Sequence, residues 1–376
     1  MPLSDYATLG SLVEPERVHK ACYADEKVFE KELEKIFYKS WIYIGHESQV
    51  PNPGDYWTTW IGRERVILCR SEDGRVHVLY NRCPHRGTLI CNNLHGNIPK
   101  AFRCPYHAWQ FNLDGSLRAV PMKQGYKDII DLSDPQLQMK RVERQDTYRG
   151  FIFASVSNDG QSLNEWLGKG AKAAFDDICN RSPEGECEIV MNCFRIIQHS
   201  NWKIFLENQL DAVHPSITHH STGDAAAQEQ RIFKQKTGED PPIGYQFLAD
   251  FSLPYEKWDA LDTIGYPYGH TVLAGYMGLR PRDPVTVAHE EALADAYGAK
   301  RMEEILSTNV HHVLVYPCLS VQPPLQQLRA VRPLAANKTL TEIWHFKLKG
   351  APPGLYERSL AYYYHVNSPS TMVNAD

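Results

Sequence analysis

The stretch NRCPHRGTLICNNLHGNIPKAFRCPYHAW, residues 81–109, carries two cysteines and two histidines in matching pairs. Cys83 and His85 form the first pair. Cys104 and His107 form the second pair, with 18 residues between the two pairs. Two loops that each present such a pair can close around a metal centre if β-hairpins hold the loops together. The pattern fits a tetrahedral zinc site with four ligands, and it fits a Rieske [2Fe–2S] cluster with both cysteines on one iron and both histidines on the other.

The order of the ligands favours the iron–sulfur cluster over zinc. Each pair runs Cys then His, so each loop can supply one ligand to each iron, whereas zinc fingers usually pair like with like. Arg86 and Gly87 add a charge and a flexible backbone beside the first pair. Loop N–H groups are also the donors that a buried cluster sulfur needs. Zinc and four unrelated residues remain the alternatives at this point.

The segments around this stretch predict a small all-β domain over residues 41–156. Short runs rich in β-branched and aromatic residues, such as YWTTWIG and RVHVLYN, alternate with turn sequences. Beyond the second pair, AWQFNLDGSLRAV predicts a hairpin whose turn is Asp114-Gly115.

An amphipathic helix is predicted over residues 25–40, before this domain. Phe29, Leu33 and Phe37 share one side of it, with acids and lysines opposite. We therefore expect residues 1–40 to form a helical segment that packs on the C-terminal domain.

The character of the sequence changes near residue 165, and residues 157–376 predict an α+β domain. Helical patterns at 163–179 and 288–306 accompany strand-like runs that suggest an antiparallel sheet, at 311–322, 327–335 and 338–349. Residues 222–245 are polar and contain Pro241-Pro242, which predicts a surface loop.

Composition describes an ordinary globular protein. The chain has 376 residues, 43% of them hydrophobic and 23% charged, with a formal net charge of −5, which speaks against a nucleic-acid binder. No apolar run is long enough to cross a bilayer, and the N-terminus lacks the pattern of a signal peptide. The nine cysteines are an odd number scattered over a long chain, so a disulfide framework is not expected. A cytoplasmic protein without membrane or nucleic-acid partners is predicted.

A second group of candidate metal ligands lies in NWKIFLENQLDAVHPSITHH, residues 201–220. The first part has a helical pattern, in which Asp211 and His214 share a face. Pro215 is expected to disturb that helix, so His219 arrives from a following turn or helix. Two imidazoles and one carboxylate are the ligands of non-haem Fe(II) oxygenases. Asp211 is either that carboxylate or an acid that orients a ligating histidine, and His220 is expected to point elsewhere.

Together, the two groups resemble the large (α) subunit of Rieske-type non-haem iron aromatic-ring-hydroxylating oxygenases, closest to the benzoate, toluate and anthranilate dioxygenase branch. The resemblance covers nearly the whole chain. It implies a Rieske [2Fe–2S] domain on Cys83, His85, Cys104 and His107. It also implies a C-terminal catalytic domain with a helix-grip-like antiparallel sheet.

The family segment Asn-x-x-Asp-x-x-His-x-x-x-x-His stands here as Asn208, Asp211, His214 and His219. The resemblance implies that His214 and His219 bind the mononuclear iron and that Asn208 and Asp211 are catalytic. Asp211 would link His214 to the cluster histidine that matches His107 on a neighbouring subunit of a trimer.

The third iron ligand of the family is a carboxylate near the end of the catalytic domain. In this chain the candidate is Asp376, either as the ligand or as the neighbour of the ligand. Members of the family usually continue a few dozen residues further, so we expect this chain to be cut short.

The function implied is a terminal oxygenase of aromatic catabolism that dihydroxylates a carboxylated arene such as a benzoate, with O₂ and electrons from NADH. Gly168 and Gly170 do not follow a strand as a dinucleotide motif requires, so a separate reductase, with or without a ferredoxin, must deliver the electrons. A trimer, alone or with small β subunits as α₃β₃, is expected. The arginines considered for the substrate carboxylate are Arg280, Arg282, Arg329 and Arg332.

Two other functions remain. The first is a Rieske monooxygenase, a hydroxylase or demethylase with the same iron sites. The second is a non-catalytic Rieske electron-transfer protein, in which the histidines after Asp211 are idle.

Overall fold

The computed structural model describes residues 9–127, 129–278, 283–368 and 371. Asp376, Arg280 and Arg282 lie outside the described residues. The chain forms two compact units. One unit takes in the described residues up to Trp166 together with Arg332–Asn337. The other takes in Leu167–Val331 and the described residues from Lys338 onward.

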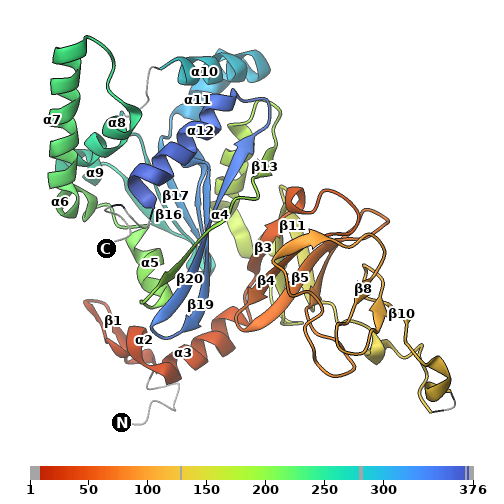
Figure 1. The fold of residues 1–376 in the computed structure, drawn as a ribbon. Coiled ribbons are helices and arrows are strands. Elements are labelled where there is room, and N and C mark those ends of the chain that lie inside the picture. Colours follow the sequence, from red (N-terminus) through yellow and green to blue (C-terminus); the bar gives the residue numbers. More distant parts are fainter. Residues whose placement is uncertain (1–8, 128, 279–282, 369–370, 372–376) are drawn as a thin grey trace. The chain divides into compact units, whose positions relative to one another are not determined.

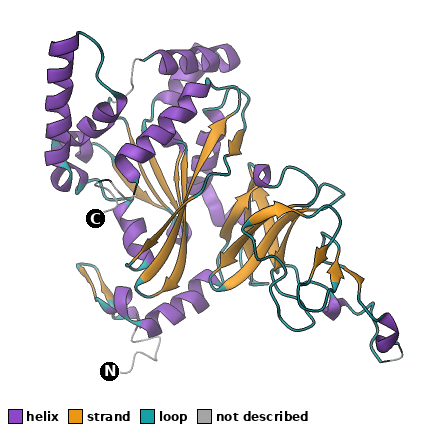
Figure 2. Cartoon of the chain, viewed as in Figure 1, coloured by secondary structure: helices purple, strands orange, loops and turns teal. Residues whose placement is uncertain are grey.

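The first unit is built from short antiparallel strands and loops (Figure 2). One sheet has the order β6-β5-β4-β7, and its strands are β4 (Asp55–Ile61), β5 (Glu64–Arg70), β6 (Val76–Tyr80) and β7 (His95–Asn97). A second has the order β11-β12-β3, from β3 (Ile42–His46), β11 (Arg144–Tyr148) and β12 (Phe151–Ser155). A third has the order β10-β9-β8, from β8 (Phe102–Arg103), β9 (Gln110–Phe111) and β10 (Leu117–Ala119). The hairpin predicted at Asp114-Gly115 joins β9 to β10.

A helical segment precedes these sheets, after a short pair of strands, β1 (Val13–Glu14) and β2 (Arg17–Val18). Helix α2 (Ala21–Ala24) leads into α3 (Glu26–Glu32), and a wider helical turn continues over Leu33–Phe37. Asp25 caps α3, because its carboxylate accepts a hydrogen bond from Lys27 N at 2.7 Å. Phe29 is buried as its place on the predicted apolar face requires.

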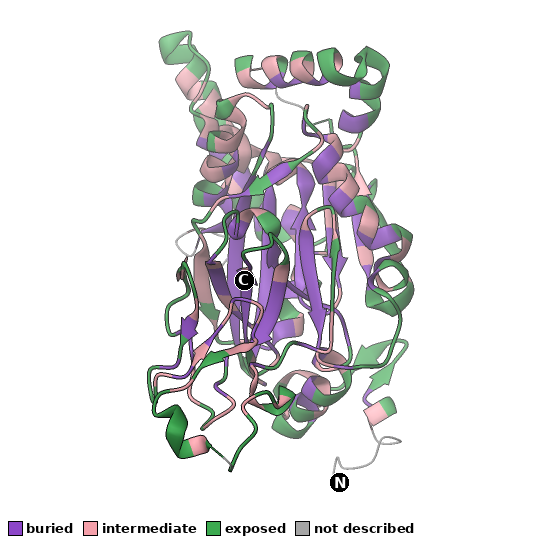
Figure 3. Ribbon diagram, turned by 90° about the vertical axis from the view of Figure 1, so that its right-hand side faces the viewer, coloured by how far each residue is buried: buried purple, intermediate pink, exposed green. Residues whose placement is uncertain are grey.

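The second unit is built on an eight-stranded antiparallel sheet in the described residues, with the order β13-β20-β19-β18-β17-β16-β15 and β14 paired to β20. Figure 1 labels β13, β20, β19, β17 and β16 of this sheet. Its strands are β13 (Cys187–Ile189), β14 (Phe194–Gln198), β15 (Asp262–Gly265), β16 (Thr271–Gly275), β17 (Val310–Val315), β18 (Leu319–Gln322), β19 (Gln327–Ala335) and β20 (Lys338–Leu348). Buried residues gather on the strands (Figure 3). The predicted α+β class with an antiparallel C-terminal sheet is confirmed.

Helices accompany this sheet. They are α4 (Leu163–Asn180), α5 (Trp202–Asn208), α6 (Pro215–Thr218), α7 (His220–Thr237), α8 (Ile243–Ala249), α9 (Tyr255–Asp259), α10 (Pro284–Tyr297), α11 (Ala299–Leu306) and α12 (Pro353–Tyr362). Within the described part of the chain, each helix is too short or too polar to cross a bilayer.

Two predictions of local structure need correction. The surface loop predicted over 222–245 is wrong for most of that range, because α7 runs to Thr237, with Gly238 in a left-handed conformation, and α8 begins at Ile243. Residues 238–242, which include Pro241-Pro242, lie between the two helices. The polar residues of α7 are the exposed side of a helix whose Gly223 and Ala226 are buried. The helix predicted over 288–306 is divided at Gly298, whose φ of 85° interrupts the helix.

Candidate metal centres

The four residues of the first group lie in two loops of matching backbone geometry. In the first loop, Cys83 N donates to Thr88 O, and Gly87 N donates to Cys83 O, both at 2.8 Å. In the second loop, Cys104 makes the equivalent bonds, to the carbonyl five residues on and from the N–H four residues on, at 2.8 and 3.0 Å. The fifth position of each loop, Gly87 or Ala108, has a positive φ, 73° or 56°. Each loop thereby turns its Cys and His toward the same region.

Like side chains meet across the two loops. The Cys104 side chain lies within hydrogen-bonding reach of the Cys83 thiol. The His85 and His107 rings are 4.7 Å apart between centroids. Among the described residues, no three His, Cys, Asp or Glu side chains converge to hold one metal ion. A single zinc ion requires all four ligands around one point, whereas two thiols beside two imidazoles fit the two irons of a Rieske cluster.

The environment of the thiols also suits a cluster. Burial raises the pKa of the Cys83 thiol to about 11, while the backbone N–H groups of His85 and Arg86 act in the opposite direction. These N–H groups are the donors to sulfur expected from the loop sequence. Nδ1 of His85 is buried without a hydrogen-bond partner, as a nitrogen that binds iron would be. The cysteines are 2% exposed, while His107 is at the surface.

Three residues that sequence reasoning missed hold these loops in place. Trp109 stacks on His85, with centroids 4.8 Å apart and an interplanar angle of 4°. Asn81 is buried and its Oδ1 accepts hydrogen bonds from Ile90 N and Cys91 N at 3.0 and 2.9 Å. A polar residue directly after a strand is too common a feature to have identified Asn81 in advance.

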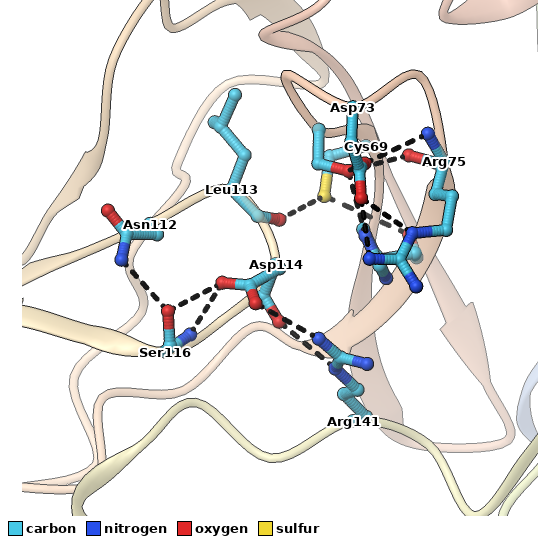
Figure 4. Close-up of polar contacts among 10 residues, drawn as sticks. Cys69, Asp73, Arg75, Asn112, Leu113, Asp114, Ser116 and Arg141 are labelled. Atoms are coloured by element: carbon cyan, nitrogen blue, oxygen red, sulfur yellow. Dashed lines mark hydrogen bonds and ion pairs between the residues drawn. The ribbon is translucent and has the colours of Figure 1, made fainter. Parts of the chain in front are cut away.

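The third missed residue, Arg141, binds the β9–β10 hairpin, which follows the second loop in the chain (Figure 4). Its Nε donates to Asp114 O at 3.0 Å, and Asp114 Oδ1 accepts from Ser116 N at 3.0 Å. In the same view, the Cys69 thiol donates to Leu113 O at 3.2 Å. The hairpin turn predicted at Asp114-Gly115 is therefore also bound to a segment outside the hairpin.

The second group lies where α5 gives way to α6 and α7. The predicted helix, which was expected to include Asp211, ends earlier, at Asn208. Asp211 lies in the following turn, where its Oδ1 accepts from Val213 N at 2.7 Å. Such a bond from an Asp side chain to the backbone two residues on competes with the helix and ends it. Pro215 starts α6 as its first residue, which a fixed φ allows at a helix N-terminus.

This turn orients His214. Asp211 Oδ2 lies 3.1 Å from His214 Nδ1, and the Asn208 Nδ2 amide contacts His214 Nε2 at 3.3 Å. Burial raises the pKa of Asp211, but N–H groups of Val213 and His214 and the charge of His214 outweigh it, so the pKa is lowered. An ionised Asp211 beside Nδ1 favours the tautomer that carries its proton on Nδ1 and its lone pair on Nε2, the atom that the Asn208 amide contacts here and at which a metal would replace that amide.

His219 faces His214 across the same site. Their ring centroids are 5.5 Å apart, and His219 is buried against Phe251 at 5.4 Å. Two adjacent imidazoles, one of them oriented by a carboxylate, fit two of the three protein ligands of a mononuclear iron. His220 turns to Asp224 instead, with its Nε2 at 3.4 Å from the carboxylate. The predicted third ligand, Asp376, lies outside the described residues.

A cavity of about 320 Å³ opens beside these histidines, lined by Asn208, Asp211, His214 and His219. Its other walls are largely apolar and aromatic, with Phe247, Phe251, Trp258, Leu273, Met277 and Tyr362 among them. Its size is that of a small-molecule site.

The two described candidate arginines differ in whether they line the cavity. Arg329 lines it. Arg332 donates instead to the carbonyls of Tyr43 and Trp60, at 3.0 and 3.5 Å, in the first unit. Gln209 was missed by the sequence analysis because its partners come from strands more than a hundred residues away.

Comparison with known proteins identifies the family of the chain. A family model described as the Rieske [2Fe-2S] domain matches residues 40–134. The chain is 30% identical to the toluate 1,2-dioxygenase α subunit of Pseudomonas putida, over 96% of this chain and 79% of that protein. It is 32% identical to the anthranilate 1,2-dioxygenase large subunit of Acinetobacter baylyi, over 86% and 67%. A naphthalene 1,2-dioxygenase structure with indole bound superposes with a TM-score of 0.76 at 27% identity, covering 94% of this chain and 76% of that one.

The Rieske domain and the kinship with Rieske oxygenases imply a [2Fe–2S] cluster and a mononuclear iron, and the residues described above fit both. The chain therefore belongs to the family of large (α) subunits of Rieske-type aromatic-ring-hydroxylating dioxygenases, and it is an oxidoreductase.

Proposed function

We propose that this protein is the terminal oxygenase component that dihydroxylates a carboxylated arene to a cis-dihydrodiol, with O₂ and electrons from a separate NADH-dependent reductase. The observation that carries the proposal is the cavity, because it is lined both by the oriented histidine pair and by aromatic side chains. The toluate and anthranilate dioxygenases among its relatives support an arene with a carboxylate.

The proposed ligands follow the geometry. Cys83 and Cys104 bind one iron of the cluster, and His85 and His107 bind the other. Residues 1–40 form an N-terminal helical segment, 41–156 the Rieske domain and 157–376 the catalytic domain.

In the catalytic domain, His214 and His219 hold the mononuclear iron. Asp376, which lies outside the described residues, is the proposed third ligand.

Once bound, the two metal centres supply electrons and activate O₂ for attack on the ring. The chain's own residues have other tasks. Asp211 keeps His214 in one tautomer and orientation through the 3.1 Å contact at Nδ1. Phe251 and Trp258, whose rings are 6.0 Å apart and nearly parallel, form an aromatic wall that excludes water from the arene.

The exposure of two residues supports a route between subunits of a homotrimer. His107 lies at the surface, beside Tyr106, which is 64% exposed. The Asp211 side chain is 44% exposed although its neighbour His219 is buried. In the proposed trimer, with or without β subunits, His107 of one copy meets Asp211 of the next.

Product analysis under ¹⁸O₂ tests the reaction. The proposal expects two labelled oxygen atoms in one dihydrodiol molecule from a benzoate. One labelled oxygen in a hydroxylated or demethylated product would identify a monooxygenase instead. A [2Fe–2S] signal in a protein that binds no further iron would identify an electron-transfer protein.

A further inference from the structure

Arg329 is a buried charge without an acidic partner. It is 3% exposed, on β19, and it lines the cavity. Its Nη1 donates to Oε1 of Gln209 and its Nη2 to Oε1 of Gln327 at 3.1 Å, so both partners are neutral amides. Its Nε has no hydrogen-bond partner. Within the described residues no carboxylate pairs with this guanidinium.

The other arginines on the cavity wall are neutralised. Arg181 pairs with Asp177 at 2.9 Å, and Arg358 pairs with Asp283. A buried charge left without a counter-ion costs several kcal/mol. Among the arginines that line the cavity in the described part of the chain, Arg329 is thus the one without an acidic partner.

The titratable groups around Arg329 do not supply that anion. Burial raises the pKa of Tyr362 and of Tyr363 to about 12, so both hydroxyls are neutral near pH 7. Burial, then the charge of Arg329, lowers the pKa of His312 and His345 to about 4, so both imidazoles are neutral too. Asp250 also lines the cavity, and burial raises its pKa to about 7 without any ion pair to Arg329.

We propose that Arg329 binds the carboxylate of the substrate inside the cavity and so determines the preference for anionic arenes. This inference rests on the proposed function, to which it adds the residue that binds the carboxylate. A carboxylate can accept two parallel hydrogen bonds from the planar guanidinium, whose Nε is buried and has no hydrogen-bond partner among the described residues.

A chain of side-chain contacts connects this anchor to the histidine pair. Gln209 accepts from Arg329 and from Gln322 Nε2, the latter at 2.9 Å. The Gln209 amide donates to Asn208 Oδ1 at 3.3 Å, and Asn208 in turn contacts His214. A carboxylate held at Arg329 therefore fixes the position of its ring relative to His214.

The test compares benzoate with nitrobenzene, a neutral molecule of nearly the same shape. Binding to the full oxygenase with its metal centres is measured by calorimetry for wild type, Arg329→Met and Arg329→Lys. We expect Arg329→Met to weaken benzoate binding about 10- to 100-fold and to change nitrobenzene binding little. Arg329→Lys keeps the positive charge but not the planar pair of N–H donors, so its affinity for benzoate should lie between those of the wild type and Arg329→Met.

The matched control is Arg332→Met, on the same strand, buried but bonded to backbone carbonyls away from the cavity. It should weaken the binding of both ligands to the same extent. The denaturation midpoint of each variant, compared with that of the wild type, reports whether the catalytic domain is still folded. An equal loss of both ligands in Arg329→Met, or no loss of benzoate, would overturn the inference.

The two levels of the proposal fail differently. If the wild type dihydroxylates neutral arenes but neither binds nor oxidises benzoate, the role of Arg329 is wrong and the dioxygenase assignment stands. If it oxidises no arene at all, the proposed function itself is wrong.

Discussion

The two candidate metal centres differ in how close together in the sequence their residues lie. All four proposed cluster ligands come from one stretch, residues 81–109, and sit in two loops with the same hydrogen-bond pattern. The second site has two histidines in one short segment, but its cavity draws on strands far along the chain. The cluster site is therefore formed by nearby residues, and we expect it to tolerate substitutions in distant parts of the chain. The second depends on tertiary packing.

The largest expected effect separates the two sites. His85→Cys should remove the normal Rieske absorption and EPR spectra and abolish oxygenation, since the imidazole ligands set the potential of the cluster. Iron analysis should still find the mononuclear site filled, because His214 and His219 come from other segments. A variant with an unchanged cluster spectrum would contradict the ligand assignment.

Asp211→Ala should lower product formation by about 100-fold while both metals stay bound, because it removes the group that orients His214. The assay is product formed per NADH consumed, together with metal content. His220→Ala is the matched control one residue beyond His219, since its ring turns toward Asp224. If Asp211→Ala formed as much product per NADH consumed as the wild type, Asp211 would not be the residue that links His214 to the cluster histidine of the next subunit.

Gly223→Ala should show that the second site depends on packing between helices. A Cβ there would lie 2.3 Å from Ser252 N and 2.6 Å from the carbonyl carbon of Phe251. Because backbone atoms cannot move aside cheaply, we expect a loss of about 1–3 kcal/mol in the free energy of unfolding. Asp224→Ala, at the next and exposed position, controls for helix propensity. Equal denaturation midpoints for the two variants would contradict this packing.

The smallest expected effect compares the two cluster loops. Gly87→Ala meets no close atom, so it should cost only the strain of a positive φ, about 1 kcal/mol. Ala108→Gly should relieve the same strain and stabilise its loop by up to about 1 kcal/mol. The denaturant concentration that bleaches the cluster measures both. Shifts of the same sign would show that the two loops are not equivalent.

The sequence pattern predicted local structure correctly where that structure depends on residues close in the chain. The β9–β10 turn and the amphipathic segment at Phe29 followed from spacing alone. The pattern predicted the wrong secondary structure where contacts with other parts of the fold determine it. Most of the polar segment 222–245 became α7 because Gly223 and Ala226 pack against the rest of the unit. The helix at 202 stopped at Asn208 because Asp211 bonds to its own backbone.

By itself, the sequence determined the cysteine–histidine loops, the Asp211–His214–His219 segment and the α+β class, since ligand spacing and strand periodicity are properties of nearby residues. It could not choose between Arg329 and Arg332. On a strand, residues three apart point to opposite faces. Only the folded sheet decided which arginine faces the cavity, and only tertiary structure brought Gln209 to it across 120 positions of chain.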